Sequence, residues 1–315
     1  MEEKIRLGIA TCLLGGKLRY DGGHKYAPFL VETLGRWVEY VPVCPEYECG
    51  LGVPREAMRL EGDPADPRLV TNKTGIDHTQ RMKDWGRKRL RELEREGLCG
   101  YIFKSKSPSS GLRRIAVYGA GGVTVKQGVG IWAAMFTRHF PQLPVEDESR
   151  LNDSRLRENF IERVFVMKRW REMTAVGMKT GALAEFHTRH KLLVMSHGVE
   201  ACRRLGKLVA GGKTMPATRL FDEYLAGLAG ALKLIAPARK HRNVLLHVLG
   251  YFKRRLDATE KQELLEVIGS YAGGLVPLIV PLTLLNHYVR KYGEPCLAKQ
   301  YYLNPHPLEL KLRNH

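Results

Sequence analysis

A thiol and a carboxylate stand almost side by side at the end of an apolar run. The segment VPVCPEYECG covers residues 41–50, and within it Cys44 is followed two residues later by Glu46. A thiolate is a nucleophile and a metal ligand, and a carboxylate can accept a proton from water. The ordinary alternative is a buried apolar cysteine beside a solvated turn carboxylate. Spacing alone leaves both interpretations open.

Two more turns of the same kind occur elsewhere in the chain. Cys12 follows the apolar run IRLGIA at 5–10, and the hydroxyl-rich loop KSPSSG at 106–111 follows the β-rich run 99–105. Ligands of an open parallel sheet bind outside the carboxyl ends of its strands. We therefore expect these three turns to meet, although they are far apart in the sequence.

The elements that would position these turns alternate between strand-like and helix-like segments. The expected strands are 5–10, 38–43, 99–105 and a last short one at 143–145, and the segments with helical spacing are 25–37, 77–97 and 129–140. This alternation predicts an α/β domain with a parallel, Rossmann-like sheet.

The pattern changes near 147–157, and the rest of the chain shows only helical spacing. The helical segments are 158–173, 182–198, 218–235, 241–256 and 260–271. The most apolar stretch, 272–285, is too short to span a bilayer and contains two prolines, so we expect a kinked core helix or a buried helix pair there. The sequence thus predicts an α/β domain over 1–150 and an all-α domain over 151–315.

The charge balance points to an anionic partner, most commonly nucleic acid. The net charge is +18, and residues 151–315 hold 27 Lys and Arg against 14 Asp and Glu. The helical half would then bind the anion. The alternative is that these cations only cover a solvated surface. The start MEEKIRLGIA lacks the features of a signal peptide, so we expect a cytoplasmic protein that is not inserted in a membrane.

Three motifs carry a resemblance to a known family. TCLLGGKLRYDGGHK, PVCPEYECGLGVPRE and FKSKSPSSG resemble the motifs of TudS-type thiouracil desulfidases, in that order along the chain. The full length resembles the longer RudS-type members, which act on 4-thiouridine in tRNA. The segments FHTRHKLLVMSH, PLIVPLTLLNHY and YLNPHPLELKLRN resemble the YbgA-like domain of those longer proteins.

The resemblance implies a [4Fe-4S] cluster held by three cysteines, with one iron left open. Cys12 and Cys44 match two of the ligands, and Ser110 occupies the position of the third. Clusters are normally held by thiolates, so a serine there implies either a weakly held cluster or a chain whose ligand has been removed. Cys49 could supply the third ligand in place of Ser110, but we expect Cys49 in the core or next to the ligands.

The resemblance also implies roles for two neighbouring side chains. The open iron would act as a Lewis acid on the sulfur, Glu46 would accept a proton from the attacking water, and Ser107 would pass a proton or bind the substrate. No net redox change is needed. Without the resemblance, both residues would be interpreted as ordinary turn residues.

The expected function is removal of sulfur from 4-thiouridine in tRNA, giving uridine and sulfide. Lys104 and Lys106 flank the active turn and are candidate phosphate contacts, as are Lys253, Arg254 and Arg255 in the helical half. Two alternatives stay open: a non-catalytic RNA-binding protein with a degenerate cluster site, and a desulfidase of free thiolated nucleobases or nucleotides.

Overall fold

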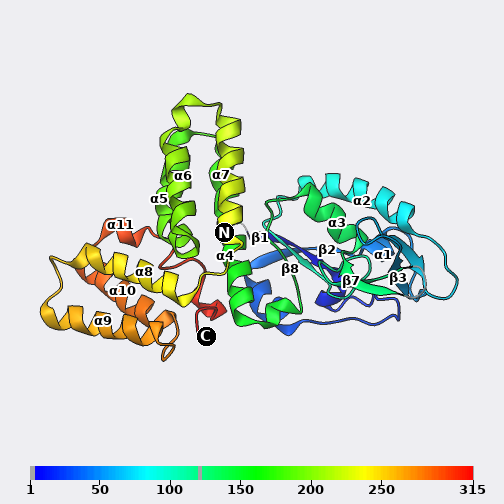
Figure 1. The fold of residues 1–315 in the computed structure, drawn as a ribbon, viewed down its shortest axis with the longest axis horizontal. Helices are drawn as coiled ribbons and strands as arrows, with labels where there is room; N and C mark the ends of the chain where they lie inside the picture. Colours follow the sequence, from blue (N-terminus) through cyan, green and yellow to red (C-terminus); the bar gives the residue numbers. More distant parts are fainter. Residues whose placement is uncertain (1–3, 120–122, 315) are drawn as a thin grey trace. The chain divides into compact units, whose positions relative to one another are not determined.

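The computed structural model describes residues 4–119 and 123–314. The chain forms two compact units, which divide between Asp153 and Ser154. Figure 1 shows the strands in the N-terminal unit and a set of helices in the C-terminal one. The predicted fold class, an α/β domain with a parallel sheet followed by an all-α domain, is confirmed.

Sheet A contains the three strands that were expected to meet. Its strands are β1 (Ile5–Ala10), β2 (Val38–Val43), β5 (Tyr101–Phe103) and β8 (Val145–Asp147), in the order β2-β1-β5-β8. Every neighbouring pair is parallel. Because β1 lies between β2 and β5, the turns that follow these three strands emerge next to one another at one edge of the sheet.

Sheet B was not predicted. Its strands are β3 (Met58–Glu61), β4 (Arg68–Thr71), β6 (Ile115–Tyr118) and β7 (Thr124–Gly128), in the order β4-β3-β6-β7. Only the β3–β6 pair is parallel. These strands are only four or five residues long, and β3 and β7 carry charged side chains such as Arg59 and Lys126, so they are shorter than the six-residue runs of β1 and β2 and less marked in the sequence.

Two helices cover sheet B and extend the core of this unit. Helices α2 (Thr79–Glu94) and α3 (Ile131–His139) pack side by side (Figure 1). Apolar side chains from both helices and from sheet B form one buried cluster, which contains Leu60, Leu69, Met82, Ile115, Val117 and Ile131. The helix predicted over 25–37 is wrong in extent, because after Pro28 the chain forms only the short helical turns Phe29–Thr33 and Leu34–Arg36.

The described residues of the C-terminal unit form helices joined by turns and loops, with no strand among them. Its helices are α4 (Ser154–Ala175), α5 (Thr180–His197), α6 (Val199–Ala210), α7 (Ala217–Leu232), α8 (Ala238–Leu249), α9 (Ala258–Ala272), α10 (Ile279–Tyr292) and α11 (Pro295–Ala298). Helices α5, α6 and α7 pack together, α9 packs on α8 and α10, and α5 also contacts α8.

The apolar stretch 272–285 forms neither a kinked helix nor a helix pair. Its first residue ends α9, residues 273–278 lie outside helical structure, and α10 begins at Ile279. Pro281 then falls in the first turn of α10, where the missing N–H costs no intrahelical hydrogen bond. No helix among the described residues combines the length and apolar character needed to cross a membrane.

Candidate functional site

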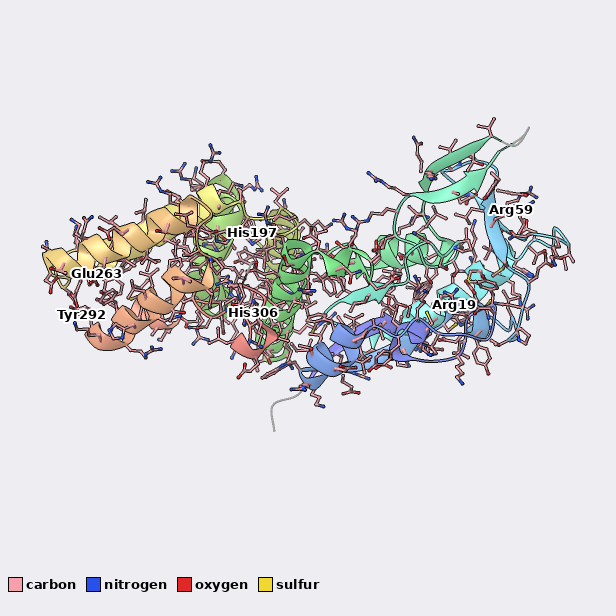
Figure 2. All side chains as sticks on the ribbon, turned by 90° about the horizontal axis from the view of Figure 1, so that it is seen from below. Arg19, Arg59, His197, Glu263, Tyr292 and His306 are labelled. Carbon is pink, nitrogen blue, oxygen red and sulfur yellow. The ribbon has the colours of Figure 1, made fainter. Side chains whose placement is uncertain are left out.

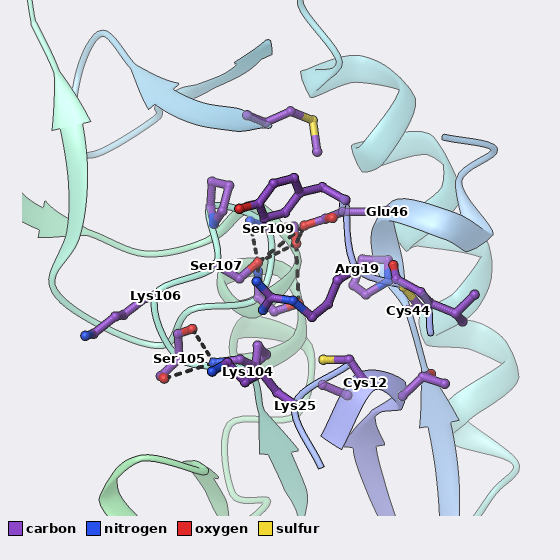
Figure 3. Close-up of a pocket in the computed structure, with 18 of the residues that line it drawn as sticks. Cys12, Arg19, Lys25, Cys44, Glu46, Lys104, Ser105, Lys106, Ser107 and Ser109 are labelled. Carbon is purple, nitrogen blue, oxygen red and sulfur yellow. Dashed lines mark hydrogen bonds between the residues drawn. The ribbon is translucent and has the colours of Figure 1, made fainter. Parts of the chain in front are cut away.

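The three turns after β1, β2 and β5 line one cavity of about 600 Å³ (Figure 3). Cys12 lies in the short turn Thr11–Leu14 directly after β1, and Cys44 lies between β2 and the short helix α1 (Pro45–Glu48). The predicted residues Glu46, Lys104, Lys106, Ser107 and Ser110 line the same cavity. The fold therefore brings together every candidate site residue that we predicted for the N-terminal unit.

Two glycines let the turn after β5, residues 107–110 (the serine turn), pack tightly against α3. The backbone N–H of Gly111 donates to the carbonyl of Ser107 at 2.8 Å, and that of Gly130 donates to Gly111 at 2.8 Å. A Cβ on Gly130 would lie 2.4 Å from the carbonyl oxygen of Ser109, closer than real side chains approach. The turn is thus fixed by backbone contacts that larger residues could not make.

The Glu46 carboxylate is held from two sides. Its Oε1 accepts a hydrogen bond of 2.7 Å from Ser109 Oγ, and Ser107 Oγ lies 3.4 Å from the same oxygen. Its Oε2 accepts from Arg55 Nε at 3.0 Å, and a second guanidinium nitrogen forms an ion pair with it. Only 15% of the Glu46 side chain and 8% of the Arg55 side chain are exposed, so the carboxylate has a fixed direction and little contact with water.

Burial disfavours ionisation of the two cavity cysteines. It raises the pKa of Cys12 to about 11, although the nearby Lys104 ammonium opposes this shift, and the Cys44 thiol adds to it. Burial also raises the pKa of Cys44. Both are therefore protonated thiols at neutral pH, and a metal that binds them must displace their protons.

The position expected for a third cluster ligand carries a hydroxyl. Ser110 is 4% exposed and its Oγ lies 3.4 Å from that of Ser109. Within 4–119 and 123–314, no group of three or more His, Cys, Asp or Glu side chains could hold a metal ion. The three expected ligand positions, Cys12, Cys44 and Ser110, accordingly carry two thiols and one hydroxyl.

The two lysines beside the serine turn differ in their partners. Lys104 is paired with Glu148, which also accepts a hydrogen bond of 2.6 Å from the backbone N–H of Ser105. Lys106 is exposed and forms no ion pair with any described residue. Lys106 is thus the freer of the two cations for a phosphate.

Three residues of this site were not predicted from the sequence. Arg55 stands within the second motif, but no role was predicted for it; Ser109 and Glu148 were not singled out either. A lone basic residue in a proline-containing turn was the available signal for Arg55. Cys49 does not line the cavity: it is 8% exposed within the apolar cluster over sheet B, as expected for a core residue.

The basic run of the helical unit lies just after α8. Lys253 and Arg254 are exposed. Arg255, in contrast, pairs with Glu294 at 3.2 Å and also donates to the backbone carbonyl of Tyr292. Two of the three predicted phosphate contacts are therefore free to meet an anion, and the third is already occupied.

Comparisons with known proteins match both units. The family model for 2-thiouracil desulfurase matches residues 7–148, and that of a protein of unknown function, DUF1722, matches 191–307. The uncharacterized protein YbgA of Escherichia coli (strain K12) is 32% identical over 165 residues, which are 52% of this chain and 98% of that protein. The chain belongs to the YbgA family. The resemblance drawn from the motifs is confirmed.

One solved structure is also similar to this YbgA-family chain. It is titled a [4Fe-4S]-dependent thiouracil desulfidase, TudS, and it has 28% sequence identity and a TM-score of 0.40. The similarity covers 48% of this chain and 95% of that one.

Proposed function

We propose that this YbgA-family chain is a desulfidase that converts 4-thiouridine in tRNA to uridine and releases sulfide. The observation that carries the proposal is the convergence of two thiols, the Glu46 carboxylate and the serine turn on one cavity. All of these residues lie within the range matched by the 2-thiouracil desulfurase family model.

The cavity fits a [4Fe-4S] cluster at two of three positions. Cys12 and Cys44 would hold it as thiolates, and the Ser110 hydroxyl would occupy the third place, where it binds iron more weakly than a thiolate. When bound, the cluster would supply an open iron that acts as a Lewis acid toward the sulfur of the substrate.

The chain's own residues supply proton transfer and orientation. Glu46 accepts a proton from water as the water oxygen bonds to the carbon that carries sulfur. The C–S bond then breaks, leaving a carbonyl group and sulfide, and no electrons are exchanged with a second reagent. Arg55 holds Oε2 of Glu46, and Ser109 and Ser107 hold Oε1, so the carboxylate need not reorient during the reaction.

The helical unit supports tRNA as the substrate. It carries most of the chain's excess positive charge, and its free cations include Lys253 and Arg254. Phosphate contacts of this kind add affinity for a polyanion and nothing for a free nucleobase. A desulfidase of free thiolated nucleotides would gain little from such a surface.

Ser110 favours one alternative, a non-catalytic RNA-binding protein whose cluster site is degenerate. Anaerobic reconstitution with iron and sulfide, followed by iron counting and a sulfide-release assay, separates the two. The substrates compared are thiolated tRNA, 4-thiouridine monophosphate and 2-thiouracil. We expect iron to bind and thiolated tRNA to have the highest kcat/KM. Tight tRNA binding without iron or sulfide release identifies the non-catalytic protein instead, and equal or faster turnover of the monophosphate identifies a nucleotide desulfidase.

A further inference from the structure

A second pocket lies over sheet B and adjoins the cavity. It is an open groove of about 920 Å³, lined by residues of β3, β6 and β7. The groove and the cavity share Met58, Lys106 and Pro108 in their walls. These shared residues make the groove and the cavity neighbours, so a chain-like ligand with one unit in the cavity could place its next units in the groove.

The groove is strongly basic. Four cationic side chains line it: Arg59, Lys106, Arg114 and Lys126. Among the described residues that line it, Glu61 is the one acid, and it is already neutralised because Arg59 Nε donates to it at 2.9 Å. The other three cations are exposed and have no ion-pair partner in the part of the chain that the structure describes. Unpaired cations that line one groove repel each other and attract an anion.

Two of these cations sit on unusual backbone. Lys106 has a φ of 58° and Arg114 a φ of 55°, in the left-handed region that L-residues other than Asn and Asp rarely adopt. Residues held in this sparsely populated region are enriched at active sites and ligand-binding segments. Here both residues line the same groove with a basic side chain, at the two ends of the segment 106–114, which contains the serine turn and leads into β6.

An aromatic side chain completes the groove. Tyr118, at the end of β6, is 42% exposed, and the Arg59 guanidinium lies 5.8 Å from the centre of its ring. Figure 2 shows Arg59 on β3, the strand that pairs with β6. An exposed ring among unpaired cations is the combination by which proteins hold single-stranded nucleic acid, with bases on the ring and phosphates on the cations.

We infer that this groove binds the single-stranded nucleotides that flank the thiolated base in an RNA substrate. The inference rests on the proposed function, since it takes the base in the cavity to belong to an RNA strand. Lys106 contacts the phosphate nearest the base, Arg114 and Lys126 contact phosphates further along, and Tyr118 stacks on a flanking base. The groove thereby selects an unpaired segment of RNA over a free nucleotide.

Fluorescence anisotropy with the full-length protein and a short, labelled single-stranded RNA tests the groove across a salt series. The double variant Arg114→Asn/Lys126→Gln removes two phosphate contacts, and asparagine accepts the left-handed backbone at position 114. We expect its slope of log K against log salt to be shallower by about 1.4. Tyr118→Leu should keep the wild-type slope but weaken binding by about tenfold, because it removes stacking and no charge.

Lys88→Gln/Arg91→Gln is the matched control, since it removes the same charge from exposed positions on α2. It should bind with the wild-type slope. A wild-type slope for the groove variant, or an equal loss in the control, overturns the inference. Failure of the proposed function is detected in a different assay: the wild-type protein would release no sulfide from any thiolated substrate. The anisotropy series needs no turnover, so the two failures can be distinguished.

Discussion

Ser109 donates a hydrogen bond of 2.7 Å to the carboxylate of Glu46, and so joins the turn after β5 to the turn after β2. Ser109 is 1% exposed, so this bond is shielded from water. The bond ties the proposed proton acceptor to the same turn that provides Ser110. The position of the carboxylate relative to the ligand turn is therefore built into the fold and does not depend on a bound substrate.

Glu46→Gln should retain iron and lose turnover by about two to four orders of magnitude, because an amide keeps the shape but cannot accept the proton. The turnover is measured as sulfide release at saturating substrate, with protein whose iron content matches that of the wild type. Glu48→Gln is the control: Glu48 accepts from the backbone N–H of Cys44 at 2.7 Å, and a Gln carbonyl can accept the same bond. Turnover of Glu46→Gln near that of Glu48→Gln would remove Glu46 as the proton acceptor.

Ser110→Cys should raise iron content and sulfide release together, because a third thiolate completes the protein ligands of the cluster. Iron per chain after anaerobic reconstitution gives the answer without an activity assay. Ser105→Cys adds a thiol to the wall of the same cavity away from the ligand position, and should leave iron content unchanged. Equal iron in Ser110→Cys and in the unaltered chain would count against Ser110 as the third ligand position.

The thiol of Cys12 should react slowly with iodoacetamide at neutral pH in iron-free protein. Burial raises its pKa to about 11, so the reactive thiolate fraction should grow about tenfold per pH unit until the pH approaches 11. Lys104→Met should slow the reaction further, because the lysine ammonium lowers this pKa. Peptide mass spectrometry follows the reaction, with the exposed Cys296 as internal reference. Alkylation of Cys12 as fast as that of Cys296 at neutral pH contradicts the shift.

Neutralising Lys253 and Arg254 to Gln should make the salt dependence of tRNA binding shallower by about 1.8, the slope expected for two lost contacts to helical RNA when the B-DNA value is used. Arg255 is left in place because it pairs with Glu294. Filter binding across a salt series gives the slope, and Lys88→Gln/Arg91→Gln is again the control of equal charge. An unchanged slope would remove these two residues from the RNA surface.

Glu162→Gln should destabilise the protein by about 3–5 kcal/mol at pH 7, since it breaks a buried charged pair. Burial alone raises the pKa of Glu162, but the hydrogen bond from His197 and the charges of His197 and Arg313 outweigh it and lower the pKa to about 2. A lowered pKa means stabilisation that is present above about pH 4.5 and is lost as the pH falls toward 2. Urea unfolding of the wild type and of Glu162→Gln should show that the difference between their free energies of unfolding is smaller at pH 3 than at pH 7. A larger difference at pH 3 contradicts the pairing of Glu162.

The strands that carry chemistry were predictable because they are buried. β1 and β2 are apolar runs, and the predicted 5–10 and 38–43 match their bounds. The parallel order then placed Cys12 and Cys44 at one edge. Sheet B was not predictable in this way, because its strands are only four or five residues long and β3 and β7 mix Arg59 or Lys126 with apolar residues.

The partners of Glu46 were also outside the reach of sequence reasoning. Arg55 reaches it across a turn and Ser109 across 63 residues, and neither contact follows from periodicity. The unusual backbone of Lys106 and Arg114 likewise depends on tertiary contacts of their turns and has no signature in residue type. What the sequence indicates is the edge at which the site forms, while the side chains that orient it become visible only in the folded chain.

The most direct test of the central claim is the conversion of 4-thiouridine in tRNA by the anaerobically reconstituted chain. Digested tRNA is analysed for 4-thiouridine and uridine, and free sulfide is measured in the same sample. We expect each 4-thiouridine lost to give one uridine and one sulfide, with no added oxidant or reductant and only in protein that holds iron. Unchanged 4-thiouridine in the presence of iron-loaded protein, or uridine formed without sulfide, would contradict it.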